Sequence, residues 1–195
     1  MNNAQKIEMI KQIYTREEIP TCLKFMGLTD RICELGVDRA DNFWLMIRHT
    51  YPKYALGIDA WSEEVCPYWK QEIHDGHLKR AQRIVKAARK WSKGDINIIK
   101  GDHSLLVDDF EDGWFDYIYI DSDHTYDCVK RDIEQWWPKV KEGGILAGHD
   151  YNTFNKLYGV VPAVNEFVEA NNIECFHITR ESIKTWIIYK PEKDT

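Results

Sequence analysis

Residues 115–151 read FDYIYIDSDHTYDCVKRDIEQWWPKVKEGGILAGHDY, and this stretch decides the fold. The apolar run FDYIYID (115–121) predicts a buried strand. Between 126 and 140 the apolar residues recur at spacings of three and four, which predicts a helix. GILAGHD (144–150) predicts a second buried strand. A strand, a helix and a strand in this order form a βαβ unit, whose two strands are parallel.

The same alternation extends to both sides of this unit. Five further apolar runs predict strands: RICELGV (31–37), YALGIDA (54–60), INIIKG (96–101), ECFHIT (174–179) and KTWIIYK (184–190). Helical patterns fill the gaps between the first five strands, from Asp41 onward and over 62–91. Only RESI separates the last two strands, which is too short for a crossover helix, so they form an antiparallel hairpin. We expect an α/β, Rossmann-like, mostly parallel sheet with helices on both faces and a terminal hairpin.

Composition and charge narrow the class of protein. The chain has 195 residues, of which 44% are hydrophobic and 30% charged, as in one globular domain. No apolar stretch reaches the roughly 18 residues of a membrane span, and no signal peptide is evident, so we expect a cytoplasmic protein without a membrane partner. The five cysteines form no CxxC pair, which disfavours zinc and disulfides. The net charge is −6, and the one basic cluster, KRAQRIVKAARKW (79–91), fits a solvated helix face better than a nucleic-acid site.

The first two strands end in residues that suit a nucleoside. In a doubly wound sheet, ligands bind at the carboxyl ends of the strands. The first strand carries Glu34 and is followed by Gly36, and the second ends in Asp59, 23 positions beyond that glycine. An acid about 20 residues after a glycine turn can accept hydrogen bonds from ribose hydroxyls. The alternatives are an ordinary turn for Gly36 and a helix N-cap for Asp59. The GxGxxG fingerprint is absent, which disfavours NAD and FAD.

Two further residues have equally open interpretations. Asp102, after the third strand, can accept a hydrogen bond from an adenine amino group or can simply be a turn residue. Trp61 can lie against an adenine ring or pack in the core.

Five ionisable residues crowd the ends of the fourth and fifth strands: Asp121, Asp123, His124, His149 and Asp150. Neighbouring parallel strands lie about 4.8 Å apart, so Asp121 and Asp150 can reach one hard cation such as Mg²⁺. Alternatively, His124 or His149 can act as a general base. Any one of these residues can be a cap or a satisfied polar contact, but together they predict a functional site.

At this point the chain resembles a known family. The stretch 115–151 closely resembles the class I S-adenosylmethionine-dependent methyltransferases, in the branch of small bacterial and phage methyltransferase-domain proteins. ICELGVDRADNF (32–43) resembles the first motif of that family, and ALGIDAW (55–61) resembles its second. Ala40 stands where the family often has a second glycine. The resemblance covers roughly residues 30–190.

The resemblance implies a fold and a cofactor site. The strand order would be 3-2-1-4-5-7-6, with strand 7 alone antiparallel. Residues 30–195 would be the S-adenosylmethionine-binding domain, preceded by a helical leader or cap at 1–29. The implied cofactor residues are Glu34 and Gly36 for the methionine part, Asp59 with its neighbour Ala60 for the ribose, Asp102 for the adenine side, and Asp121 at the end of strand 4.

Some relatives in this family also bind a metal. The catechol, caffeoyl-CoA and certain sugar O-methyltransferases hold Mg²⁺ through an aspartate on strand 4 and an Asp-Asn or Asp-Asp pair on strand 5. Asp121 matches the first ligand, whereas the pair is replaced here by His149-Asp150. Either His149 joins Asp121 and Asp150 as a metal ligand, or a histidine (His124 or His149) replaces the metal as the base.

These observations predict a methyltransferase that acts on a small hydroxylated acceptor, such as a sugar, a catechol or a natural-product hydroxyl. N-methylation stays open. A non-catalytic adenosylmethionine-binding module is one alternative. A nicotinamide-dependent oxidoreductase is another, but it would need phosphate-binding glycines that this sequence lacks. The segments that could cap the substrate, 1–29 and 151–159, are short, so a homodimer could complete the site.

Overall fold

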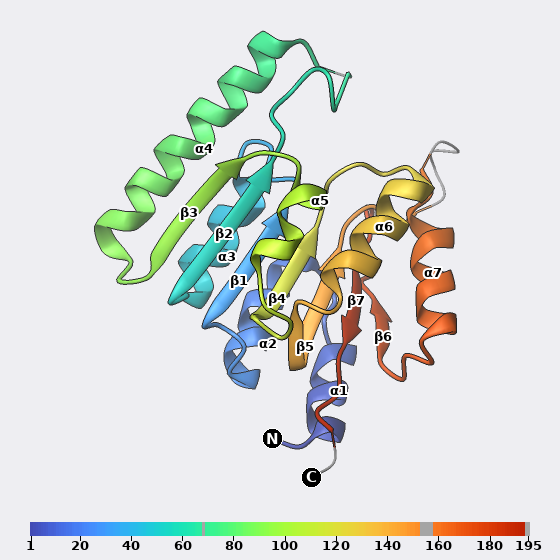
Figure 1. Cartoon of the computed structure of the whole chain (residues 1–195). Helices are drawn as coiled ribbons and strands as arrows, with labels where there is room; N and C mark the ends of the chain where they lie inside the picture. Colours follow the sequence, from blue (N-terminus) through green and yellow to red (C-terminus); the bar gives the residue numbers. More distant parts are fainter. Residues whose placement is uncertain (68, 153–157, 194–195) are drawn as a thin grey trace.

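The computed structural model describes residues 1–67, 69–152 and 158–193, and a single seven-stranded sheet lies at its centre (Figure 1). The strand order is β3-β2-β1-β4-β5-β7-β6. The strands are β1 (Arg31–Leu35), β2 (Tyr54–Asp59), β3 (Asp95–Lys100), β4 (Phe115–Ile120), β5 (Val140–Gly148), β6 (Phe176–Ile178) and β7 (Trp186–Tyr189). The first five strands pair in parallel, and β7 is antiparallel to both β5 and β6. The predicted fold class, strand order and terminal hairpin are therefore confirmed.

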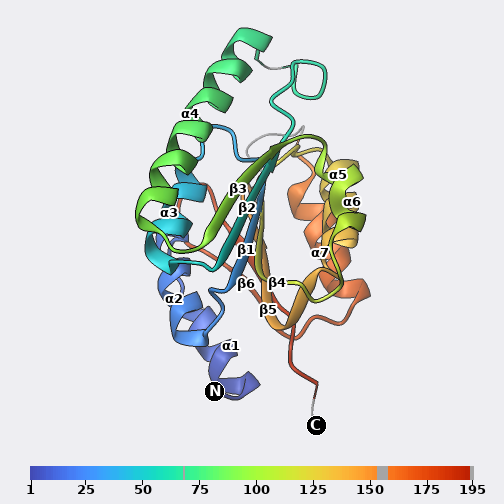
Figure 2. The same cartoon turned by 60° about the vertical axis from the view of Figure 1, so that its left-hand side comes forward.

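Helices cover both faces of the sheet (Figure 2). One layer holds α1 (Asn3–Lys11), α2 (Ile19–Met26), α3 (Asp41–Thr50) and α4 (Gln71–Trp91), and the other holds α5 (His103–Leu106), α6 (Tyr126–Trp136) and α7 (Val160–Ala170). Two short 3₁₀ turns, Arg16–Glu18 and Val107–Asp109, connect elements. Side chains alternate along each strand, so Ile32 packs in the core beneath the first layer while Cys33 packs in the core beneath the second.

The N-terminal leader is part of the main core. Ile10, Ile19 and Leu23 are almost fully buried and belong to the same hydrophobic cluster as Tyr117 and Tyr119 of the central strand β4. The leader therefore packs against the sheet as part of the same core.

Three elements differ from the sequence-based expectation. The helix expected over 62–91 begins only at Gln71. Before it, the Cys66 N–H donates to the Ser62 carbonyl in a turn, and Pro67 follows. The side chains of Glu63 and Gln71 each accept from the other residue's backbone N–H, which fixes the start of the helix. The helix expected up to 140 ends at Trp136, and β5 begins at Val140 rather than at 144. α7 was not predicted; its Pro162 sits in the first turn, where a missing N–H costs little.

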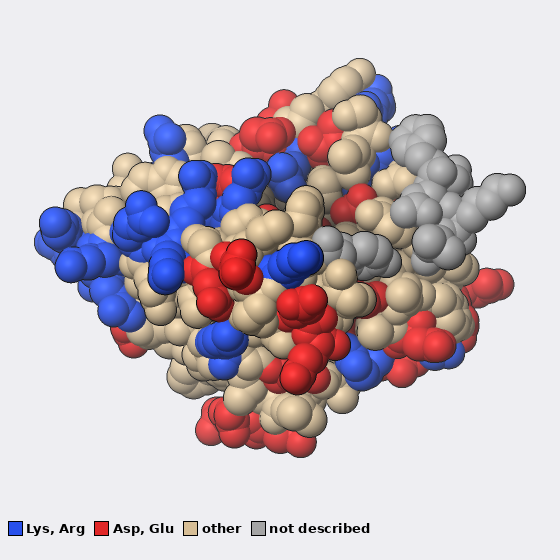
Figure 3. All heavy atoms as spheres, turned by 90° about the horizontal axis from the view of Figure 1, so that it is seen from above, with Lys and Arg blue, Asp and Glu red and all other residues tan. Residues whose placement is uncertain are grey.

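The basic face of α4 is solvated, as predicted. Lys79, Arg83 and Lys86 are exposed, whereas Ala81 and Val85 on the opposite side of the helix are buried. Seen from above, Lys and Arg side chains gather on the α4 side of the molecule (Figure 3). Within the described ranges, no helix combines the length and the apolar character needed to cross a bilayer.

Candidate active site

Gly36 joins the ends of β1 and β4. It has φ +84°, and a Cβ at this position would lie 2.0 Å from the backbone oxygen of Asp121. Its N–H donates to the Ile58 carbonyl at 2.8 Å, and the Asp121 N–H donates to Leu35 at 2.8 Å. The glycine thus lets the loops after β1 and β4 touch at the centre of the strand-end edge, the edge of the sheet where the parallel strands have their carboxyl ends. The sequence predicted the glycine turn, but the group that approaches its backbone closely is Asp121.

Ala40 accounts for the departure from the family's first motif. It is fully buried, has φ +64° and stands at the N-cap of α3. This left-handed backbone conformation favours glycine, which explains why the family often has a glycine at this position. Alanine is the smallest residue with a Cβ, and it holds the same turn here at some conformational cost.

Glu34 is a buried acid directed toward this edge. It lies on β1 opposite Tyr119 of β4 and is 3% exposed. Burial, reinforced by the charge of nearby Asp121, raises the pKa of the Glu34 carboxyl well above its usual range. Its Oε2 atom has no hydrogen-bond partner among the described residues. A buried acceptor without a partner is costly, so this oxygen suits a ligand that donates to it.

Asp59, at the end of β2, connects two loops. One carboxylate oxygen accepts from the Asp38 N–H at 2.8 Å and the other from the Trp61 N–H at 2.7 Å. It is not a helix N-cap, since α4 begins only at Gln71. Ala60 follows it and is half-buried. Each carboxylate oxygen keeps a second lone pair, so a ribose hydroxyl can still donate to Asp59.

Trp61 packs in the core. Its side chain is 1% exposed, and its indole N–H donates to the Asp38 carbonyl at 2.9 Å. The tryptophan therefore fixes the shape of the loop after β1 and offers no free face to an adenine ring.

Asp102 caps the short helix α5. Burial alone would raise its pKa, but hydrogen bonds from the hydroxyl and the backbone N–H of Ser104 hold the pKa of Asp102 below its usual range. The Ser104 N–H lies 2.9 Å from the Asp102 oxygen. Asp102 is thus a turn residue at the end of β3, and it has a free lone pair for an adenine amino group.

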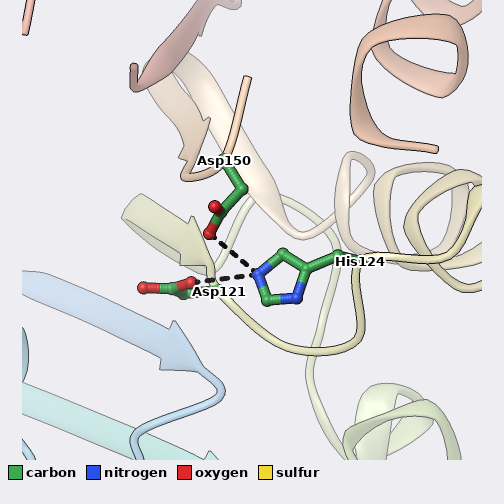
Figure 4. Close-up of side chains that lie close together, drawn as sticks. All are labelled: Asp121, His124 and Asp150. Atoms are coloured by element: carbon green, nitrogen blue, oxygen red, sulfur yellow. Dashed lines mark ion pairs between the residues drawn. The ribbon is translucent and has the colours of Figure 1, made fainter. Parts of the chain in front are cut away.

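Three residues converge where β4 and β5 end: Asp121, His124 and Asp150 (Figure 4). His124 Nε2 lies 2.9 Å from Asp150 Oδ2 and 3.6 Å from Asp121 Oδ1. One possible ligand atom from each residue lies within 4.8 Å of the other two. The expected meeting of Asp121 and Asp150 is therefore present in the structure, and the imidazole between them belongs to His124.

His149 lies at the edge of this group. Its Nδ1 atom is 3.0 Å from Asp150 Oδ2 and 3.8 Å from Asp121 Oδ1. Asp123 is exposed and accepts from the Thr125 N–H at 2.7 Å, so it shapes the loop. Of the five residues that the sequence singled out here, four face one another and Asp123 does not.

The cluster stabilises positive charge. Burial alone would lower the pKa of His124, but the carboxylates of Asp121 and Asp150 raise it to about 9. Burial alone would raise the pKa of Asp150, but the imidazoles of His124 and His149 hold it well below its usual range. The ring of His124 also stacks on Tyr158, with 4.6 Å between ring centroids.

Sequence reasoning missed two groups near the site. Asp132 of α6 is fully buried, accepts from the Ser122 hydroxyl at 2.7 Å and lies 2.8 Å from His103 Nε2, so it ties the loops after β3 and β4 together. Arg16 of the leader acts electrostatically on Tyr119 and Asp121. Helical periodicity places Asp132 on an apolar face, which was the only available signal. Nothing local marks Arg16.

A family profile described as "Methyltransferase domain" matches residues 35–151, which is more than half of the chain. The chain belongs to this family. The family resemblance and the cofactor expected from the sequence, S-adenosylmethionine, are therefore confirmed.

Solved structures share the fold at low sequence identity. A putative caffeoyl-CoA O-methyltransferase from Staphylococcus aureus has a TM-score of 0.65 and 14% identity, over 94% of this chain and 91% of that one. An O-methyltransferase from Bacillus cereus, in complex with S-adenosylhomocysteine, has a TM-score of 0.56 and 13% identity, over 97% and 82%. At such identities the likeness shows the fold alone.

Two curated relatives are much longer than the matched segment. A protein from Sinorhizobium fredii is 26% identical over 135 residues, which make up 67% of this chain and 14% of that protein. A protein from Acanthamoeba polyphaga mimivirus is 33% identical over 63 residues, 32% of this chain and 28% of that protein. The chain thus matches less than a third of the length of either relative.

Proposed function

We propose that this methyltransferase domain transfers the methyl group of S-adenosylmethionine to a hydroxyl oxygen of a small acceptor. The observation that carries the proposal is the convergence of Asp121, His124 and Asp150 directly beside the β1 end. Glu34 and Gly36 lie on one side of this point, and the acid–histidine cluster lies on the other. A methyl donor on the first side would present its reactive carbon to an acceptor on the second.

The chemistry requires alignment and removal of one proton. The acceptor oxygen attacks the sulfonium methyl carbon, the O–CH₃ bond forms as the S–CH₃ bond breaks, and S-adenosylhomocysteine leaves as a neutral thioether. The hydroxyl proton must pass to a base. A hydroxyl is a weak acid, so a cluster that stabilises its oxyanion helps. An amine acceptor attacks in its neutral form, which arises when its ammonium form loses a proton near neutral pH, so it needs no such stabilisation. The acids and histidines beside the cofactor side therefore favour O-methylation.

The donor set fits a divalent cation. Asp121 and Asp150 supply carboxylate oxygens, and His124 supplies a nitrogen within 4.8 Å of both. Two carboxylates and waters suit Mg²⁺, and a histidine in the set also suits softer divalent ions. Bound there, such an ion would lower the pKa of the acceptor hydroxyl. His149, which contacts Asp150 at 3.0 Å, would hold that carboxylate in place.

The experiment has a binding arm and a turnover arm. Calorimetry with S-adenosylhomocysteine and with NAD should show binding of the first ligand alone; binding of NAD instead would refute the cofactor side of the proposal. Turnover is then measured on sugars, catechols and phenolic acids, first with chelator and then with Mg²⁺ added back. Loss and recovery of turnover support a metal. Turnover that survives the chelator and fails in His149→Ala or His124→Ala assigns the proton to a histidine. Methylation of amines alone would contradict O-methylation.

A further inference from the structure

Arg16 is a half-buried positive charge near the proposed cofactor site. It lies in the first 3₁₀ turn, between α1 and α2. Its charge acts on Tyr119 and Asp121, and also on Glu34 of β1. Glu34 and Tyr119 are partners across the β1–β4 pair, so the charge of Arg16 acts on neighbouring side chains of these two strands.

The leader is fixed at this point by several contacts with the terminal hairpin. The Arg16 N–H donates to a Glu181 carboxylate oxygen at 3.0 Å. Two residues earlier, the Tyr14 carbonyl accepts from the Arg180 N–H at 2.8 Å, and the Ile13 carbonyl lies 2.7 Å from His177 Nε2. These contacts fix the backbone of the leader at Arg16.

The guanidinium is incompletely paired. Its Nε atom is buried and has no hydrogen-bond partner among the described residues. A buried N–H without a partner is destabilising, so this atom suits a ligand that accepts from it. The Glu34 Oε2 atom is also buried without a hydrogen-bond partner among the described residues. Arg16 and Glu34, whose charges act on each other, thus supply one unpaired donor and one unpaired acceptor.

We propose that Arg16 binds the carboxylate of the methionine part of S-adenosylmethionine, while Glu34 accepts from its ammonium group. This inference rests on the proposed function. The cofactor carries one anionic group, its α-carboxylate, and planar guanidinium donors match carboxylate oxygens. An anionic acceptor is the rival ligand, because the charge of Arg16 also acts on Asp121 of the acid–histidine cluster. We favour the cofactor carboxylate because the same charge acts on Glu34 and Tyr119, which are partners across the β1–β4 pair.

The test compares two ligands that differ by one group. Calorimetry would measure the affinity of S-adenosylhomocysteine and of its decarboxylated analogue, which keeps the ammonium and the adenosine. Arg16→Met should weaken binding of S-adenosylhomocysteine about 10- to 100-fold, the range for a charge-assisted hydrogen bond. It should change the affinity of the decarboxylated analogue less than about threefold. Arg16→Lys should retain part of the discrimination between the two ligands.

Arg180→Met is the matched control. Arg180 is also an arginine that contacts the leader, but its guanidinium stacks on the Tyr14 ring, 4.6 Å from the ring centroid. Its loss should therefore change the affinity of neither ligand. If Arg16→Met fails to fold, Arg16→Lys and the wild-type preference for the carboxylated ligand decide the question.

Three results would overturn the proposal. If Arg16→Met weakened the binding of both ligands equally, Arg16 would have a structural role and would not bind the carboxylate. Unchanged ligand affinity with a raised KM for the acceptor would assign Arg16 to the acceptor. A wild-type chain that bound neither ligand would refute the proposed function itself.

Discussion

The two halves of the strand-end edge hold their acids in different ways. On the β2 and β3 side, Asp59 and Asp102 accept hydrogen bonds from backbone N–H groups of the loops that follow β1, β2 and β3. On the β4 and β5 side, Asp121 and Asp150 face the imidazole of His124. Backbone donors cannot leave without unfolding the loop, so the first half is a preformed surface. Imidazole partners can move or lose a proton, so the second half can exchange them for a cation or a reacting group.

The largest expected effect is on turnover, and it tests the second half. Asp150→Asn should reduce kcat at least about 1,000-fold, or roughly 4 kcal/mol, because it removes a charge that acts on the acceptor. The affinity for S-adenosylhomocysteine should stay within about threefold. Asp123→Asn is the control, since this neighbouring acid is exposed and only bonds Thr125. Equal loss of cofactor affinity in Asp150→Asn would erase the distinction between the two halves.

The next effect is on stability, and it tests the point where the halves meet. Gly36→Ala should lower the free energy of unfolding by about 3 kcal/mol, because its Cβ would overlap the Asp121 backbone and the residue has positive φ. Gly27→Ala is matched for conformation, with φ +70° and nothing within 4 Å of the added Cβ, and should cost about 1 kcal/mol. Urea denaturation of both variants measures the difference. Equal costs would mean that only backbone conformation matters at Gly36.

The comparison also explains what the sequence could predict. The strands, the hairpin and the acids at the strand ends follow from short-range patterns of apolar runs, spacing and turn residues, whereas the strand order was implied by the family resemblance. The start of α4 at Gln71 depends on a side-chain pair with Glu63, which periodicity does not encode. Which histidine lies between Asp121 and Asp150 depends on loop geometry after β4. Arg16 reaches the site through contacts with Glu181, 165 positions away, so no local signal marks it.

A smaller effect concerns cofactor affinity and tests the first half. Asp59→Ala should weaken binding of S-adenosylhomocysteine by about 1–3 kcal/mol, because a ribose hydroxyl loses its charged acceptor. The Asp38 and Trp61 N–H groups lose the same acceptor, so some stability should be lost as well. Asp59→Asn keeps an oxygen for one of these donors, so its ligand affinity and its stability should lie between those of the wild type and of Asp59→Ala. Calorimetry on variants that melt cooperatively would show unchanged affinity if Asp59 served the loops alone.

The smallest expected effect is a pH dependence at Glu34, which lies between the halves. The pKa of this buried carboxyl is raised well above its usual range, so the folded state keeps a proton that the unfolded state releases above about pH 4.5. Folding stability must therefore fall as the pH rises from there toward the folded-state pKa, by at most about 1.4 kcal/mol per pH unit. Glu34→Gln removes this dependence on pH, even if the substitution also changes the stability by an amount that is the same at every pH.

The stability of Glu34→Gln relative to wild type should consequently increase between pH 5 and pH 8. Urea denaturation at both pH values measures this difference. Glu134→Gln, at an exposed position on α6, is the control and should show a constant offset. A constant offset for Glu34→Gln as well would mean that Glu34 is ionised in the fold. Its unpaired oxygen would then carry a full negative charge, and the cofactor ammonium would meet a carboxylate rather than a neutral acid.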